Sequence, residues 1–148
     1  MLLLCAACSG SHPPRAADAP PAGGRLGNAS ASCVAPYLDH QPSSRLRASA
    51  RDLAPTVGPG ESITIYGHWY TSTCNDTGGH DPLEPLPPVH LTLTLPGGDV
   101  TQLGAFHPGG ADMGFAVEVH VPPGTPAGAA QVRDDQRYPS MFEFEVGR

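Results

Sequence analysis

The sequence contains no lysine: its eight basic residues are all arginine, and they are spread thinly along the chain. The chain has no basic run, and its formal net charge is −6. A protein that binds the phosphate backbone needs a concentrated positive surface. The composition therefore argues against nucleic-acid binding, while the acidic balance favours solubility.

Long apolar runs and aromatic side chains are also scarce. No segment reaches the length of about 20 apolar residues that a transmembrane helix needs, and aromatic residues make up only 6% of the chain. Glycine and proline, by contrast, number 18 each and fall between short apolar segments. This pattern is typical of turns in an all-β protein. The 148 residues suffice for one domain with a modest, aliphatic core, plus a tail.

Residues 1–10 resemble an export signal. They read M-L-L-L-C-A-A-C-S-G, a short apolar run followed by two alanines, a cysteine and small residues. This resembles the end of a bacterial lipoprotein signal peptide of the actinobacterial type, with Cys8 as the acylated residue. The shortness of the apolar run predicts that the signal peptide begins upstream of Met1. The alternative is an ordinary N-terminal tail with free thiols at Cys5 and Cys8.

The resemblance implies a lipid anchor at Cys8 that would hold the protein on the outer face of a cell membrane. Residues 9–31 are dominated by proline, alanine, glycine and serine and have almost no large apolar side chains. Such a segment cannot bury enough surface to offset the entropy that it would lose on ordering. We therefore expect a partial lipoprotein-type signal segment over 1–8, a disordered tether over 9–31 and a folded domain over 32–148.

Two cysteines, Cys33 and Cys74, fall within the expected domain. In an oxidising compartment such a pair most simply forms a disulfide. The bridge would close a loop of about forty residues and stabilise the fold by roughly 3–4 kcal/mol in the chain-entropy model. The alternative is a metal-binding or redox pair, although no third ligand stands at a zinc-like interval.

Alternating apolar and polar residues predict the strands of the domain. The clearest alternation runs over residues 89–95, and a Pro-Gly-Gly-Asp turn joins it to a returning strand over 100–106 as a hairpin. A second strong pattern follows a Pro-Gly turn and contains the alternating sequence E-S-I-T-I-Y-G. This pattern predicts a strand over 61–67. The remaining expected strands cover residues 113–121, 128–133 and 141–146, with a polar edge strand over 45–53.

The order of these motifs resembles that of bacterial immunoglobulin-like extracellular domains. Residues 57–67 read V-G-P-G-E-S-I-T-I-Y-G, residues 114–128 read G-F-A-V-E-V-H-V-P-P-G-T-P-A-G, and a closing F-E-F-E-V follows. The resemblance covers roughly residues 55–146 and implies an all-β fold, an antiparallel immunoglobulin-like β-sandwich of about seven strands. Because the motifs report turns and strands, they imply no particular chemistry.

The strand over 61–67 and the residues just after it hold the first candidate site. Alternation places Trp69 on the core face and places Tyr66, His68 and Tyr70 on the opposite, outward face. An exposed aromatic stripe would suit a glycan or a protein partner. The alternative is that another loop covers this face.

Histidine supplies the second candidate site. His68, His90 and His120 all fall on expected outward faces of strands, so a metal site assembled across strands is conceivable. Short-range ligand patterns such as H-x-H or H-E-x-x-H are missing. Solvated surface histidine is the simpler interpretation.

Catalytic motifs are missing as well, including the G-x-S-x-G sequence of serine hydrolases. The sequence therefore predicts a non-enzymatic binding or structural module at the cell surface that needs no cofactor. Its partner would be a cell-envelope protein or a glycan. The leading alternative function is an extracytoplasmic metal-binding protein that uses histidines on strand faces, and a small secreted enzyme is a further alternative.

Overall fold

The computed structural model describes residues 34–43, 54–73 and 82–147. These residues form strands and turns but no helix, so none of them belongs to a helix that could cross a membrane. The prediction of an all-β protein is confirmed. The strands are β1 (Tyr37–Asp39), β2 (Thr56–Val57), β3 (Ser62–His68), β4 (Val89–Thr94), β5 (Val100–Phe106), β6 (Phe115–His120), β7 (Gly128–Asp134) and β8 (Met141–Val146).

Several predictions from the sequence fall on other parts of the chain. The expected lipid anchor at Cys8, the disulfide between Cys33 and Cys74, and the edge strand over 45–53 all lie outside the described residues. The same is true of the tether over 9–31. These remain predictions.

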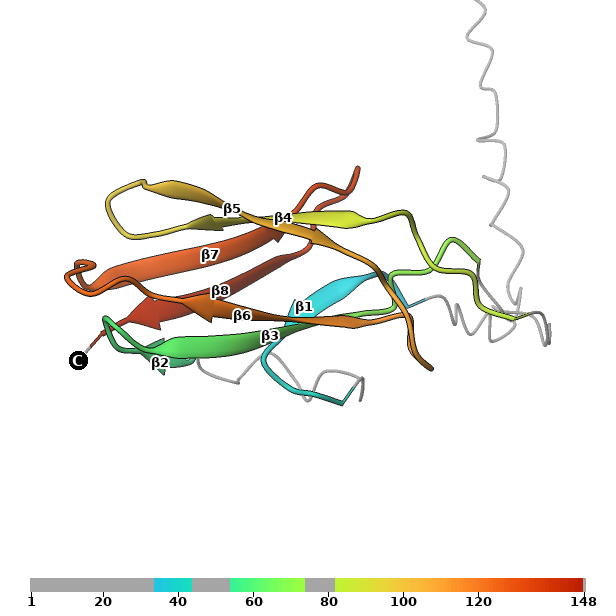
Figure 1. Cartoon of the computed structure of the whole chain (residues 1–148), viewed down its shortest axis with the longest axis horizontal. Helices are drawn as coiled ribbons and strands as arrows, with labels where there is room; N and C mark the ends of the chain where they lie inside the picture. The colour runs from blue at the N-terminus through green and yellow to red at the C-terminus, as the bar shows by residue number, and fades with distance from the viewer. Residues whose placement is uncertain (1–33, 44–53, 74–81, 148) are drawn as a thin grey trace, which may run out of the picture.

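The strands form two sheets, one with the order β1-β3-β6 and one with the order β2-β8-β7-β4-β5 (Figure 1). Every pair is antiparallel except β2 with β8, which is parallel. The described part therefore has eight strands rather than the expected seven, and one pair departs from the antiparallel prediction. The unexpected strands, β1 and β2, are three and two residues long, too short to show an alternating pattern.

The inward side chains of both sheets form one hydrophobic core, which confirms the alternation expected for the longer strands. In β4 every second residue is buried, and the residues between them are exposed or half-buried. β8 and the second half of β6 follow the same rule. The largest fully buried side chains of the core are Tyr70, Phe144, Ile65, Leu91, Val89, Val119, Val121, Val132 and Val146.

Beyond β3 the chain departs from the predicted alternation. Trp69 has a φ of 60°, a conformation that is rare for a bulky side chain, and its backbone N–H donates to the carbonyl of Asp112 over 2.8 Å. The alternation ends where the backbone stops being extended. As a result Tyr70 is completely buried, while Trp69 is only half-buried. The prediction that Trp69 is the core residue and Tyr70 an exposed one is wrong.

The two ends of the sheets differ in chemistry. The end at the right of Figure 1 contains the end of β3, the starts of β4 and β6, and the β7–β8 loop. Of the described residues, both buried polar side chains, His68 and Asp134, lie there. So do both non-glycine residues with positive φ, Trp69 and Met113. Backbone strain and buried polar groups tend to gather at functional sites, and the other end consists of turns rich in glycine and proline.

Candidate binding surface at the β7–β8 loop

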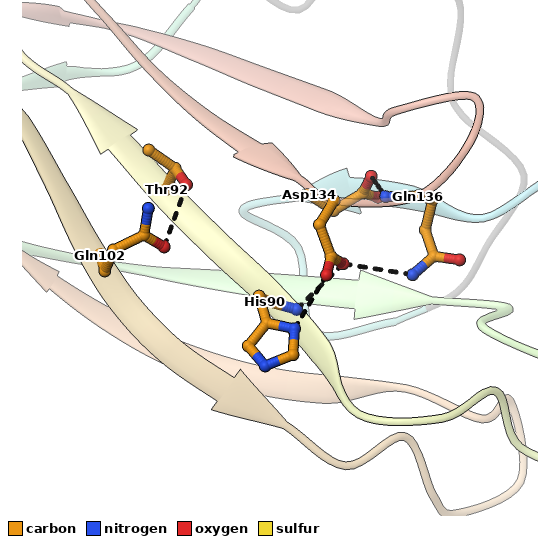
Figure 2. Close-up of polar contacts among 6 residues, drawn as sticks. His90, Thr92, Gln102, Asp134 and Gln136 are labelled. Atoms are coloured by element: carbon orange, nitrogen blue, oxygen red, sulfur yellow. Dashed lines mark hydrogen bonds and ion pairs between the residues drawn. The ribbon is translucent and has the colours of Figure 1, made fainter.

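The β7–β8 loop, residues 135–140, is attached to the core through Asp134, the last residue of β7, which Figure 2 shows bonded to Gln136. The buried Asp134 carboxylate accepts a 2.7 Å hydrogen bond from the Tyr70 hydroxyl. Its other oxygen accepts a 3.0 Å hydrogen bond from the backbone N–H of Gln136. The backbone N–H of Asp134 also donates to the carbonyl of Ser140 over 3.2 Å, which closes the loop. One carboxylate thus ties the loop to the segment that follows β3.

The environment of Tyr70 keeps its phenol protonated. Burial raises the pKa of Tyr70 far above its ordinary value, and the hydrogen bond to Asp134 and the negative charge of Asp134 raise it further. The hydroxyl is therefore a permanent hydrogen-bond donor at physiological pH. A buried carboxylate needs such donors to offset the loss of water.

A second attachment holds the loop from the outside of the sheet. His90, on β4, donates to the Asp135 carboxylate from its backbone N–H over 3.1 Å and from its ring Nδ1 over 2.8 Å (Figure 2). Desolvation acts to raise the pKa of Asp135, but the hydrogen bonds from His90 outweigh it and hold this pKa below its usual value. Both side chains are about half exposed, so the pair contributes little to stability. The two bonds join Asp135, the first residue of the loop, to β4.

After these attachments, which lie at its start, the loop presents large side chains to solvent. Tyr138 is 81% exposed, and the Arg137 guanidinium carbon lies 5.5 Å from the centre of its ring. Met141, at the start of β8, is 52% exposed and lies directly opposite the exposed Arg133 of β7. Two of the three exposed large hydrophobic side chains among the described residues therefore occur here.

The sequence patterns described above do not predict this surface. The available signal was the segment Q-R-Y-P at 136–139, which places an arginine and an aromatic residue in a connection between two strands. Turns favour glycine, proline, asparagine, aspartate and serine. A large aromatic residue at such a position is therefore a hint of function, because loops held by a rigid scaffold often carry binding residues.

The predicted binding face of Tyr66, His68 and Tyr70 is not an exposed surface. Tyr66 is half-buried, whereas His68 is 2% exposed and Tyr70 fully buried. The His68 ring lies 2.8 Å from the Asp112 carboxylate through Nδ1 and 3.1 Å from the Gln41 carbonyl through Nε2. The prediction that all three side chains are exposed is wrong, because the segments after β1 and before β6 cover His68 and the backbone turn directs Tyr70 inward.

The three histidines of the alternative metal site do not meet. His68 and His120 belong to the same sheet but lie at opposite ends of it, since His120 pairs with Ser62 at the start of β3. His90 belongs to the other sheet and bonds to Asp135. His90 and His120 are exposed, as predicted. Among the described residues no group of three or more histidine, cysteine, aspartate or glutamate side chains could hold a metal ion.

Neither the protein-family models nor the curated proteins that were searched contain a match to this sequence. The geometry of the β7–β8 loop is therefore the main guide to function.

Proposed function

We propose that this protein is a non-enzymatic binding module on the outer face of a cell membrane, tethered by a lipid on Cys8 and folded as an immunoglobulin-like β-sandwich. Two observations support the fold assignment. The two sheets share one core, and the order of the sequence motifs resembles that of extracellular immunoglobulin-like domains. The partner binds at the β7–β8 loop. In immunoglobulin-type folds the loops cluster at the ends of the sheets and often carry recognition.

The observation that carries the proposal is a loop held on both sides while its tip exposes Tyr138. Asp134 holds the loop from the core and His90 holds it from the outer face. A preorganised loop loses little conformational entropy on binding, so its binding affinity is higher. Tyrosine adds a large contact area with few rotatable bonds, which is why binding loops use it often.

Site-specific photo-crosslinking in the native cells tests the binding surface. We expect full-length protein with the photoreactive residue p-benzoylphenylalanine in place of Tyr138 to form a discrete adduct with its partner. The matched control carries the same residue in place of Val100, which is also an exposed hydrophobic side chain (62%) but lies at the start of β5. Absence of an adduct at position 138, or equal adducts at both positions, would argue against this surface.

The anchor has a separate test. We expect mass spectrometry of the mature, membrane-associated protein to find an acylated cysteine, Cys8, at the N-terminus. An unmodified Cys8 in the full-length native product would refute the anchor while leaving the binding surface untouched.

A further inference from the structure

The surface beside the β7–β8 loop combines an unusual set of side chains, Arg133, Arg137, Tyr138 and Met141, which we call the arginine–tyrosine surface. The two arginines are the only ones among the described residues. Tyr138 and Met141 are two of the three large hydrophobic side chains exposed in that part of the chain. Positive charge and exposed apolar area therefore coincide at one place in a protein whose formal net charge is −6.

The register of the sheet places Arg133 beside Met141, and Arg137 and Tyr138 lie in the short loop that joins their strands. Arg133 on β7 lies between Met141 on β8 and Thr92 on β4, and neither neighbour is charged. Tyr138 stands three residues before Met141, so their Cα atoms are at most about 11 Å apart. Arg137 stacks on the ring of Tyr138. This contact positions the guanidinium and leaves its planar set of N–H donors available.

Neither arginine forms an ion pair with any carboxylate in the described part of the chain. The carboxylates nearby in the sheet have other partners. Glu143, two residues after Met141, accepts a hydrogen bond from Gln131, and Asp135 is bound by His90. The two guanidinium groups thus remain available to an external carboxylate, with which arginine forms strong and often bidentate hydrogen bonds.

We infer that the arginine–tyrosine surface binds an acidic segment of a partner protein, in which carboxylates and apolar side chains alternate. This inference rests on the proposed binding function. Carboxylates of the segment pair with Arg133 and Arg137, and its apolar side chains cover Tyr138 and Met141. Tyrosine, methionine and arginine are among the residue types enriched in protein–protein interfaces. A neutral glycan would leave both guanidinium groups unpaired.

The test uses full-length protein and a synthetic peptide in which glutamate alternates with leucine, monitored by NMR chemical shifts. We expect saturable shifts at the amides of the arginine–tyrosine surface that weaken as salt increases. The matched peptide with glutamine in place of glutamate should bind at least about tenfold more weakly, because it offers no charge-assisted hydrogen bonds. Equal binding of the two peptides, or shifts that map elsewhere, would overturn the inference.

Variants then assign the contact. Arg133→Ala and Arg137→Ala are both exposed substitutions that should keep the fold, and each should weaken peptide binding about five- to tenfold. The control Glu118→Ala, an exposed charge change on β6, should leave the affinity unchanged within about twofold. Unchanged affinity in both arginine variants refutes the inference. If the peptide fails but position 138 still cross-links, the acidic chemistry is refuted and the binding surface stands; if both fail, the proposed function falls too.

Discussion

Replacing Tyr70 with phenylalanine is expected to lower the free energy of unfolding by about 2 kcal/mol, although it removes a single oxygen atom. The Tyr70 hydroxyl is the donor to one oxygen of the buried Asp134 carboxylate. Without it that oxygen has no donor among the described residues, and the carboxylate retains only the N–H of Gln136. A hydrogen bond to a charged group contributes about 1.5–3 kcal/mol, and a buried group left unsatisfied is costly. Urea denaturation followed by circular dichroism measures the loss.

The neighbouring substitution Tyr66→Phe is the matched control. Tyr66 lies on β3, is half-buried, and its hydroxyl makes no hydrogen bond with a described residue. Its removal should change stability by less than about 0.5 kcal/mol. If Tyr66→Phe and Tyr70→Phe were equally destabilising, the Tyr70–Asp134 contact would not be the source of the effect.

The same pair makes stability depend on alkaline pH. The pKa of Tyr70 is raised in the folded state, whereas an unfolded tyrosine titrates near its ordinary value of about 10. Above that pH the unfolded chain binds fewer protons than the folded one, so the stability is complete at lower pH and falls as the pH rises further. We expect one of the four tyrosines to ionise in near-ultraviolet absorbance only as the protein unfolds. The Tyr70→Phe variant should lack this late component.

A methyl group at Gly114 is expected to destabilise the fold by about 2–3 kcal/mol, the upper part of the usual range for overpacking. Gly114 precedes β6, and a Cβ there would lie 2.5 Å from the backbone carbonyl oxygen of Gly67. This oxygen cannot move away like the end of a side chain, because Gly67 pairs with Phe115 in the sheet. Thermal or urea denaturation of Gly114→Ala measures the change.

Gly109 offers the matched control for this prediction. Gly109 and Gly114 are bridge partners that exchange two 2.8 Å backbone hydrogen bonds. A Cβ at Gly109 would meet nothing within 4 Å, and its backbone conformation is not one reserved for glycine. Gly109→Ala should therefore be neutral or slightly stabilising. Equal losses in the two variants would contradict the steric explanation.

Predictions from the sequence succeeded where the backbone stays extended. The alternation of Val89, Leu91 and Leu93 in β4 is visible in the sequence and is reproduced by the burial of those side chains. The predicted alternation failed directly after β3, because one residue with positive φ, Trp69, ended the two-residue period. Periodicity contains no information about such a residue.

The candidate site was less predictable than the fold. Residue type and spacing predict a binding face at Tyr66, His68 and Tyr70. Spacing along one strand does not reveal which other segments cover that strand. Tyr138 is not predicted because its significance depends on two attachments of the loop. These join Asp134 to Tyr70 and Asp135 to His90, pairs that are 64 and 45 positions apart in sequence. Such contacts exist only after the strands have paired.

The sequence by itself determined the all-β class, the alternating core and the positions of the main turns, because these depend on local patterns of apolar residues, glycine and proline. Only the tertiary structure decided that His68 and Tyr70 are buried, that His68, His90 and His120 stay apart, and that Arg133 lies opposite Met141. It also decided that the Arg137 guanidinium lies over the exposed ring of Tyr138. The physical reason is that burial and charge pairing depend on neighbours from distant parts of the chain. Strand order and register determine these neighbours, and a local sequence pattern does not specify either of them.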